Sequence, residues 1–251
     1  MDYLTNKNIN LVAHRGYAKA FPENSLSAFQ AAVDCGCMFL ELDVQLSSDL
    51  VPIVIHDDNL LRTGSKDISI LKNKFSLISE NSVGEAERFG EKFKNEIILS
   101  LSDFAQWLSQ YPEVKVFVEL KEESIELFGH KNVLDKTLEA IASIKDQCFL
   151  ISFDAPFLFH AKQYSDYPIG FVLHEYKNDT RKVAEQLQPE LLICNYKKIP
   201  DTDDGLWMDS WEWFLYEICD PELAKKWLGR GVSYIETMDI KPMLQAFSNE
   251  L

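Results

Sequence analysis

Apolar runs of about four to eight residues recur along the whole chain, and stretches with helical periodicity follow many of them. Most of the runs are continuous rather than alternating, as is typical of strands that are buried on both faces. Nine strands are predicted, at residues 11–14, 38–44, 51–56, 114–121, 148–153, 169–174, 190–194, 213–218 and 232–237. Seven helices are predicted, at residues 25–35, 102–110, 131–144, 155–163, 180–187, 221–228 and 241–248.

Strand and helix alternating along the whole chain predict an α/β fold with a parallel sheet. The 251 residues match the usual size of a TIM-type (β/α)8 barrel, and a doubly wound open sheet is the alternative. Nine strands are one more than this barrel needs. Because residues 45–50 are too few to hold a crossover helix, strands 38–44 and 51–56 are predicted to form a hairpin.

The segment from Asn59 to Asn95 is rich in Ser, Lys, Glu and Gly, and its periodicity is weak. A helix at Ser79–Phe89 is the clearest element expected within it. The segment is therefore predicted to be an insertion after the second histidine motif. Residues 1–251 would then form one barrel domain.

Composition narrows the class of protein. No apolar run approaches the roughly 20 residues that span a bilayer, and Met1–Asn10 has no apolar signal-peptide core. The five cysteines are scattered, which favours a reducing, cytoplasmic setting. A formal charge of −15 argues against a nucleic-acid partner and an anionic membrane surface. It does not exclude a small phosphate compound, because a metal ion or an arginine can reverse the field locally.

Candidate chemistry lies where polar residues end or interrupt apolar strands. Successive side chains of a strand point to opposite faces, so Glu41 and Asp43 share one face, as do Glu119 and Lys121. In a barrel, the carboxyl ends of the strands converge on one pocket. The residues expected there are His14, Arg15, Glu41, Asp43, His56, Glu119 and Lys121.

This set predicts both a metal ion and a phosphate. Three carboxylates suit Mg²⁺ or Ca²⁺ better than Zn²⁺, and an arginine with a lysine suits a phosphate. The other histidines are expected to be ordinary surface or core residues, with His174 as the first reserve. Glu23 and Asn24 are interpreted as loop and cap residues, with Asn24 capping the first helix.

Several short motifs in the first 155 residues resemble the glycerophosphodiester phosphodiesterase family. The motifs are His14-Arg15-Gly16, Pro22-Glu23-Asn24-Ser25, Glu41-Leu42-Asp43-Val44, His56-Asp57, Glu119-Leu120-Lys121 and Ser152-Phe153. The resemblance implies a barrel that uses a divalent cation to hydrolyse glycerophosphodiesters to glycerol 3-phosphate and an alcohol.

By motif, the resemblance also implies the role of each residue. The metal would be held by Glu41, Asp43 and Glu119. His14 and His56 would form the acid–base pair, and Arg15 with Lys121 would hold the phosphoryl oxygens.

Two departures from the family pattern leave the alcohol of the substrate open. Leu50 follows Asp49 where the family usually has glycine, and Tyr216-Glu217-Ile218-Cys219 stands where it has tryptophan, threonine and asparagine. The alternatives are a related phospholipase D-like enzyme acting on lysolipids, and a barrel that binds a phosphate ligand without turnover. The choice between Mg²⁺ and Ca²⁺, the order of the two histidines, the nucleophile and the oligomeric state stay open.

Overall fold

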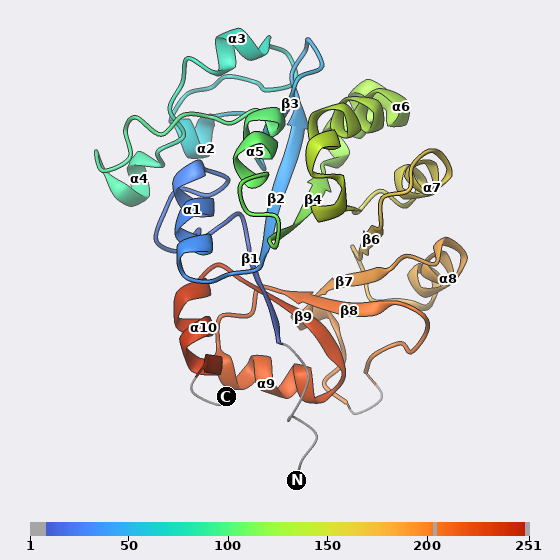
Figure 1. Cartoon of the computed structure of the whole chain (residues 1–251). Helices are drawn as coiled ribbons and strands as arrows, with labels where there is room; N and C mark the ends of the chain where they lie inside the picture. Colours follow the sequence, from blue (N-terminus) through green and yellow to red (C-terminus); the bar gives the residue numbers. More distant parts are fainter. Residues whose placement is uncertain (1–8, 203–204, 249–251) are drawn as a thin grey trace.

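The computed structural model describes residues 9–202 and 205–248, and its strands close into a parallel barrel with helices outside (Figure 1). The closed ring excludes the open doubly wound sheet and confirms the TIM-type prediction. It closes because β1 pairs in parallel with both β2 and β9. The eight strands of the ring are β1 (Asn10–Ala13), β2 (Phe39–Leu46), β4 (Lys115–Leu120), β5 (Cys148–Ser152), β6 (Ile169–Val172), β7 (Leu191–Asn195), β8 (Glu212–Tyr216) and β9 (Val232–Thr237).

The ninth strand, β3 (Pro52–Val54), lies outside the ring. It pairs antiparallel with the end of β2, with Val44 opposite Val54 and Leu46 opposite Pro52. The predicted hairpin is therefore confirmed. β3 carries the chain to His56, which places this histidine beside the carboxyl ends of the barrel strands.

In the described part of the chain, seven helices of eight residues or more lie outside the strands (Figure 1). They match the predicted helices within a few residues, except that α6 begins at Glu122 rather than Lys131. The helical pattern is broken at Gly129, whose φ of 78° interrupts α6. The helices are α1 (Leu26–Asp34), α5 (Leu101–Leu108), α6 (Glu122–Ile141), α7 (Ala155–Tyr164), α8 (Asn178–Leu187), α9 (Pro221–Gly229) and α10 (Ile240–Ser248).

Hydrophobic side chains form one layer inside the barrel and another between the strands and the helices. The inner layer includes Val12, Phe117, Ile151, Val172, Ile193, Phe214 and Tyr234. Their chain neighbours, such as Val116 and Val118, belong to the outer layer. Side chains alternate along a strand, so Glu41, Asp43 and Glu119 stand on the inner face, above the inner layer.

The segment Asn59–Asn95 is mostly irregular. It contains three short helices, α2 (Leu61–Gly64), α3 (Phe75–Ile78) and α4 (Ala86–Phe89), and it contributes Leu60, Ile70, Ile78 and Val83 to a separate small hydrophobic cluster. The predicted helix at Ser79–Phe89 is wrong except for its last turn. Ser82 pairs with Ile97 in an isolated bridge, which requires extended backbone there.

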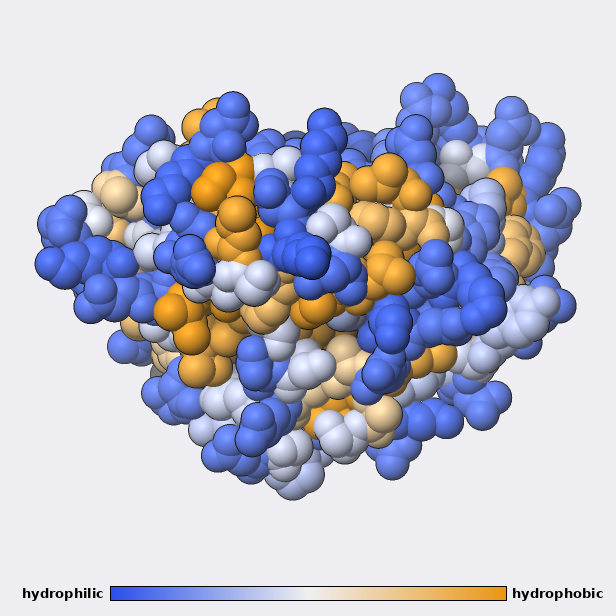
Figure 2. All heavy atoms as spheres, turned by 90° about the horizontal axis from the view of Figure 1, so that it is seen from above, coloured by the Kyte–Doolittle hydropathy of each residue, from blue (hydrophilic) through white to orange (hydrophobic). Residues whose placement is uncertain are grey.

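The face of the molecule that carries α3 and the tip of the β2–β3 hairpin is hydrophilic around most of its margin (Figure 2). Hydrophobic residues gather in separate patches between the hydrophilic ones. Within residues 9–202 and 205–248, no helix combines the length and the hydropathy that a membrane crossing requires.

Candidate active site

A cavity of about 190 Å³ opens at the carboxyl ends of the strands. It brings together residues that lie more than 100 positions apart in the chain. Six of the seven predicted site residues line it, namely His14, Arg15, Glu41, His56, Glu119 and Lys121. The seventh, Asp43, is only 1% exposed and contacts Arg15 and Lys121.

The three predicted metal ligands form one group of oxygen donors. Glu41, Asp43 and Glu119 each offer a carboxylate oxygen, and these oxygens lie within 4.8 Å of one another. Glu41 Oε1 and Asp43 Oδ1 are buried and accept no hydrogen bond from the described residues. A buried carboxylate oxygen that accepts no hydrogen bond is costly, and an oxygen-only set suits a hard divalent cation. The residues present therefore fit such an ion.

The pKa shifts of the three carboxylates also agree with a site for a divalent cation. Burial, followed by the charge of Asp43, raises the pKa of Glu41 well above its ordinary value, and the same two causes raise the pKa of Glu119. Burial opposes ionisation of Asp43 as well, but Arg15 and Lys121 outweigh it and hold its pKa below the ordinary value. A bound cation would favour the charged form of all three carboxylates.

Arg15 and Lys121 are fixed beside these carboxylates. Arg15 Nε lies 2.9 Å from Asp43 Oδ2, and its backbone N–H donates to Glu41 at 3.0 Å. Lys121 Nζ donates to Glu119 Oε1 at 2.7 Å and lies 3.4 Å from Asp43 Oδ1. Both cationic groups reach the cavity, where they can contact a phosphate.

The two predicted catalytic histidines share the cavity but differ in their surroundings. His14 Nε2 lies 3.8 Å from Glu41 Oε2, and burial together with Arg15 lowers the pKa of His14 to about 3. The side chain of His56 is 34% exposed, and its Nδ1 lies 2.7 Å from Asp57 Oδ1. Arg62 donates to Asp57, so this carboxylate is held in place beside His56.

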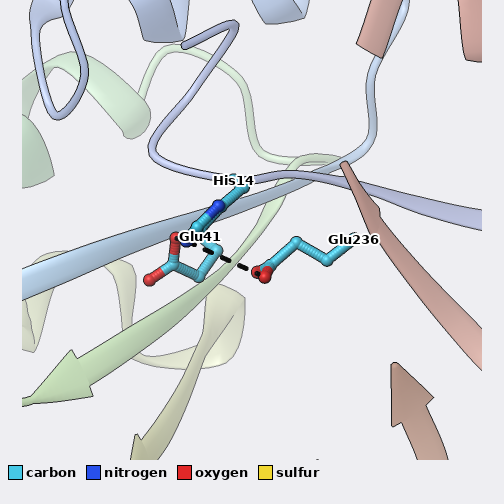
Figure 3. A group of neighbouring side chains, drawn as sticks. All are labelled: His14, Glu41 and Glu236. Carbon is cyan, nitrogen blue, oxygen red and sulfur yellow. Dashed lines mark ion pairs between the residues drawn. The ribbon is translucent and has the colours of Figure 1, made fainter. Parts of the chain in front are cut away.

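Glu236 is a site residue that the sequence prediction missed. It lies on β9, is 5% exposed, lines the cavity, and places its Oε2 3.9 Å from His14 Nε2 (Figure 3). Figure 3 shows Glu236 and Glu41 on either side of the His14 ring. The available signal was a carboxylate that interrupts the apolar run 232–237, the same signal that identified Glu119.

Glu23 and Asn24 were interpreted as loop and cap residues, and both contact the site. Asn24 Nδ2 donates to Asp43 Oδ2 at 2.8 Å, and Glu23 accepts from Arg15 and Arg62. The predicted cap was wrong, because the side chain of Ser25, not that of Asn24, accepts from the N–H of Ala28 at the start of α1. Asn24 instead holds the Asp43 carboxylate from the side.

The two departures from the family pattern are local. Leu50 has a φ of 61°, the left-handed conformation that favours glycine, so the turn keeps the backbone shape that a glycine would give. Tyr216 ends β8 and lines the cavity, followed by Glu217 at its mouth with a φ of 65°. His174, the reserve histidine, pairs with Glu122 at 2.8 Å and is not among the lining residues of the cavity.

Comparison with known proteins agrees with this arrangement. A model of the glycerophosphoryl diester phosphodiesterase family matches residues 14–203. A glycerophosphodiester phosphodiesterase of Caldanaerobacter subterraneus subsp. tengcongensis is 35% identical over 111 residues, which is 44% of this chain and 44% of that protein. In this and three other curated relatives, the matched region covers about half of the relative's own length.

Solved structures share the fold over nearly the whole chain. An Oleispira antarctica phosphodiesterase, solved in complex with the product sn-glycerol-3-phosphate, has a TM-score of 0.84 and 23% identity over 96% of this chain and 97% of that one. A glycerophosphodiester phosphodiesterase of Thermotoga maritima has a TM-score of 0.74 and 21% identity over 96% and 99%. Since the family model matches well over half of the sequence, the chain belongs to the glycerophosphoryl diester phosphodiesterase family.

Proposed function

We propose that the protein is a metal-dependent phosphodiesterase that hydrolyses glycerophosphodiesters to glycerol 3-phosphate and an alcohol. One observation carries the proposal: a single cavity is lined by a buried carboxylate cluster, two basic side chains and two histidines. The Oleispira antarctica structure, named for its glycerol 3-phosphate product, supports this substrate class.

Glu41, Asp43 and Glu119 would hold the divalent cation, Mg²⁺ or Ca²⁺. When bound, such an ion polarises phosphoryl oxygens and stabilises the charge of the transition state. Asn24 keeps Asp43 in position by donating to its Oδ2. The backbone N–H of Arg15 does the same for Glu41.

The phosphodiester is an anion that repels nucleophiles, so its charge must be offset before attack. Arg15 and Lys121 reach the cavity from the side of Asp43 and would neutralise the non-bridging oxygens. Their own partners, Asp43 and Glu119, hold these cationic groups in fixed positions. This preorganisation spares the site a rearrangement during the reaction.

His14 and His56 would move the protons. One accepts the proton of the attacking oxygen, and the other donates a proton to the departing alkoxide. The attacking oxygen is that of water or the adjacent hydroxyl of the substrate glycerol, and the second route passes through a cyclic phosphate. Asp57 orients His56 through its bond to Nδ1, which leaves Nε2 for the substrate.

The insertion at residues 59–95 contacts residues of the candidate active site. Its residues Arg62 and Glu85 bind Glu23, the first through its side chain and the second through the backbone N–H of Glu23. Glu23 in turn binds Arg15. We therefore treat the chain as one catalytic domain, and the unpaired state of its five cysteines suits a cytoplasmic location.

The test is release of glycerol 3-phosphate from glycerophosphocholine by protein treated with EDTA and then supplied with Mg²⁺ or Ca²⁺. Treatment should abolish release, and one of the two ions should restore it. Asp43→Asn should remain inactive at every ion concentration. Product release that is unaffected by EDTA, or no release with either ion from folded protein, would refute the proposal.

A further inference from the structure

His56 lies beyond the strands that fix most of the site. It follows β3, the strand outside the ring, and 34% of its side chain is exposed. In the described part of the chain, the one hydrogen bond of its ring joins Nδ1 to Asp57 Oδ1, at 2.7 Å. A histidine that transfers protons must be held at a fixed position, so whatever holds Asp57 also decides where His56 lies.

Asp57 is held by Arg62, a residue of the insertion. Arg62 Nε and Nη2 donate to the two carboxylate oxygens of Asp57, at 2.8 and 3.1 Å. Arg62 Nη1 and Nη2 donate in the same way to the two oxygens of Glu23, at 2.8 and 2.7 Å. Because the guanidinium group is rigid and planar, these two paired contacts fix the position of one carboxylate relative to the other.

Glu23 is the buried end of this arrangement. It is only 5% exposed, and its Oε1 also accepts from Arg15 Nη1 at 2.8 Å. The side chain of Asp57 is 22% exposed, so the better-anchored carboxylate is that of Glu23. A continuous path of hydrogen bonds runs from Arg15 through Glu23, Arg62 and Asp57 to His56.

We propose that Arg62 is a positioning residue, which holds His56 in place for proton transfer by fixing Asp57 against the buried Glu23. Arg62 is not among the lining residues of the cavity, so it acts through these partners rather than on the substrate. The insertion thereby contributes one side chain to turnover. The inference rests on the proposed function, in which His56 transfers a proton.

The two paired contacts require an arginine. A lysine at this position keeps the positive charge, but its single nitrogen cannot form a double hydrogen bond with each of two carboxylates. Arg62→Lys therefore separates the geometry of the group from its charge. If Arg62 served only to neutralise Glu23 and Asp57, lysine would replace it.

The test measures kcat and KM for glycerophosphocholine at saturating metal. Arg62→Ala should lower kcat by about 10- to 100-fold, because a displacement of about 1 Å is enough for a loss of this size. Arg62→Lys should remain at least about fivefold below the wild-type kcat. KM should change less than about threefold in both variants, since Arg15 keeps its contacts with Glu23 and Asp43.

Arg88→Ala is the matched control. Arg88 belongs to the same insertion, is 37% exposed, and donates to Glu85 at 2.6 Å and to the carbonyl of Ala18 at 2.5 Å. It ties the insertion to the loop after β1, but none of its hydrogen bonds within residues 9–202 and 205–248 reaches Asp57. Arg88→Ala should therefore keep the wild-type kcat, whatever its effect on Tm.

A double-mutant cycle tests the route through Asp57. Asp57→Ala leaves the pair of Arg62 with Glu23 in place, and it should lower kcat about as much as Arg62→Ala does. Adding Arg62→Ala to Asp57→Ala should lower kcat by less than about a further twofold, because residues that act in one chain are not additive.

Wild-type kcat in Arg62→Ala, Arg62→Lys or Asp57→Ala would overturn the inference. Equal losses in Arg62→Ala and Arg88→Ala, or losses that multiply in the double variant, would also overturn it, since the insertion would then act only by stabilising the fold. The proposed function would stand in each case. If circular dichroism shows that Arg62→Ala does not fold, Arg62→Lys and Asp57→Ala decide by the same criteria. A wild-type protein that hydrolyses no glycerophosphodiester with either ion would refute both the proposed function and this inference.

Discussion

His14 and His56 reach one cavity from parts of the fold that are not neighbours in the ring. His14 follows β1, and His56 follows β3, the strand outside the ring. Their surroundings differ, because the His14 side chain is 16% exposed and lies beside Arg15, whereas His56 is one-third exposed and bound to Asp57. Two histidines in different settings suit two different proton-transfer roles.

Replacing either histidine should therefore slow turnover strongly. His14→Ala and His56→Ala should each lower kcat by roughly 10²–10⁴, the usual contribution of a positioned acid or base. The measurement is glycerol 3-phosphate release at saturating metal and substrate. His160→Ala, which changes a histidine in a separate surface groove, should keep wild-type activity. Wild-type turnover in either active-site variant would remove that histidine from the mechanism.

The carboxyl group of Glu23 should make the stability of the protein depend on pH. Burial opposes its ionisation, but the hydrogen bond from Arg62 and the charge of Arg15 outweigh it and hold its pKa below the ordinary value of 4.5. A carboxyl with a lowered folded-state pKa stabilises the protein above pH 4.5, and this contribution is lost as the pH falls through the folded-state pKa.

Glu23→Gln should accordingly unfold more easily than the wild-type protein at pH 7, by about 2 kcal/mol. The difference should shrink as the pH is lowered from 4.5 toward 3. Urea unfolding across this pH range measures it, and Glu212→Gln serves as the control for removal of an exposed carboxylate. A difference that stayed constant down to pH 3 would show that the ion pairs of Glu23 do not stabilise the fold.

At the scale of single residues, the sequence predicted the site residues that end or interrupt strands. It missed site residues whose contacts are far away in the sequence. All seven predicted residues meet at the cavity or directly beneath it. Asn24 contacts Asp43 across 19 positions, which no local pattern reveals. Glu236 carried the right local signal, but only the pairing of β9 with β1 brings it to His14.

Among the elements, the strands followed the prediction best because each is a short apolar run with polar ends. The helices differed where the backbone departs from helical geometry. Gly129 breaks α6, so a single periodic pattern could not cover both of its parts. In the insertion, tertiary pairing of Ser82 with Ile97 overrides the helical propensity of residues 79–85.

Gly170 in β6 shows how tightly neighbouring strands pack inside the barrel. A Cβ atom at this position would lie 2.8 Å from Ile151 Cγ2 and 2.9 Å from Ile193 Cδ1, both in the inner layer. The absence of a side chain thus makes room for the residues on β5 and β7.

Gly170→Ala should overfill this layer and destabilise the protein by about 1–3 kcal/mol. Thermal or urea unfolding measures the change. Gly229→Ala is the control, because a Cβ atom at the end of α9 would meet nothing within 4 Å. Equal stabilities for the two variants would mean that Ile151 and Ile193 adjust without cost.

For the molecule as a whole, acidic side chains gather at the cavity as well as being spread over the surface. The chain carries a formal charge of −15, and four of its carboxylates, Glu41, Asp43, Glu119 and Glu236, line the cavity or lie directly beneath it. Folding brings Glu119 and Glu236 to Glu41 and Asp43, so the mutual repulsion of the four carboxylates is much stronger in the folded chain than in the unfolded one.

Metal binding should therefore stabilise the fold measurably. At a free ion concentration about 100 times Kd, binding to the folded state alone contributes about 2.7 kcal/mol, which raises Tm by about 5–10 °C for a chain of this size. A thermal scan with EDTA, with Mg²⁺ and with Ca²⁺ measures the shift. Asp43→Asn should lose most of it, and a wild-type Tm that responds to neither ion would contradict the assigned ligands.

The pairing of β1 with β9 has a consequence for biosynthesis. As the ribosome releases the chain, β1 emerges before the other strands of the ring, but it cannot pair with its second neighbour until β9 has emerged. During that interval the growing sheet keeps two unprotected edges, which are exposed to association with other nascent chains. Glu236 arrives with the strand that closes the ring, so the pocket is complete only after every other strand of the ring has been made.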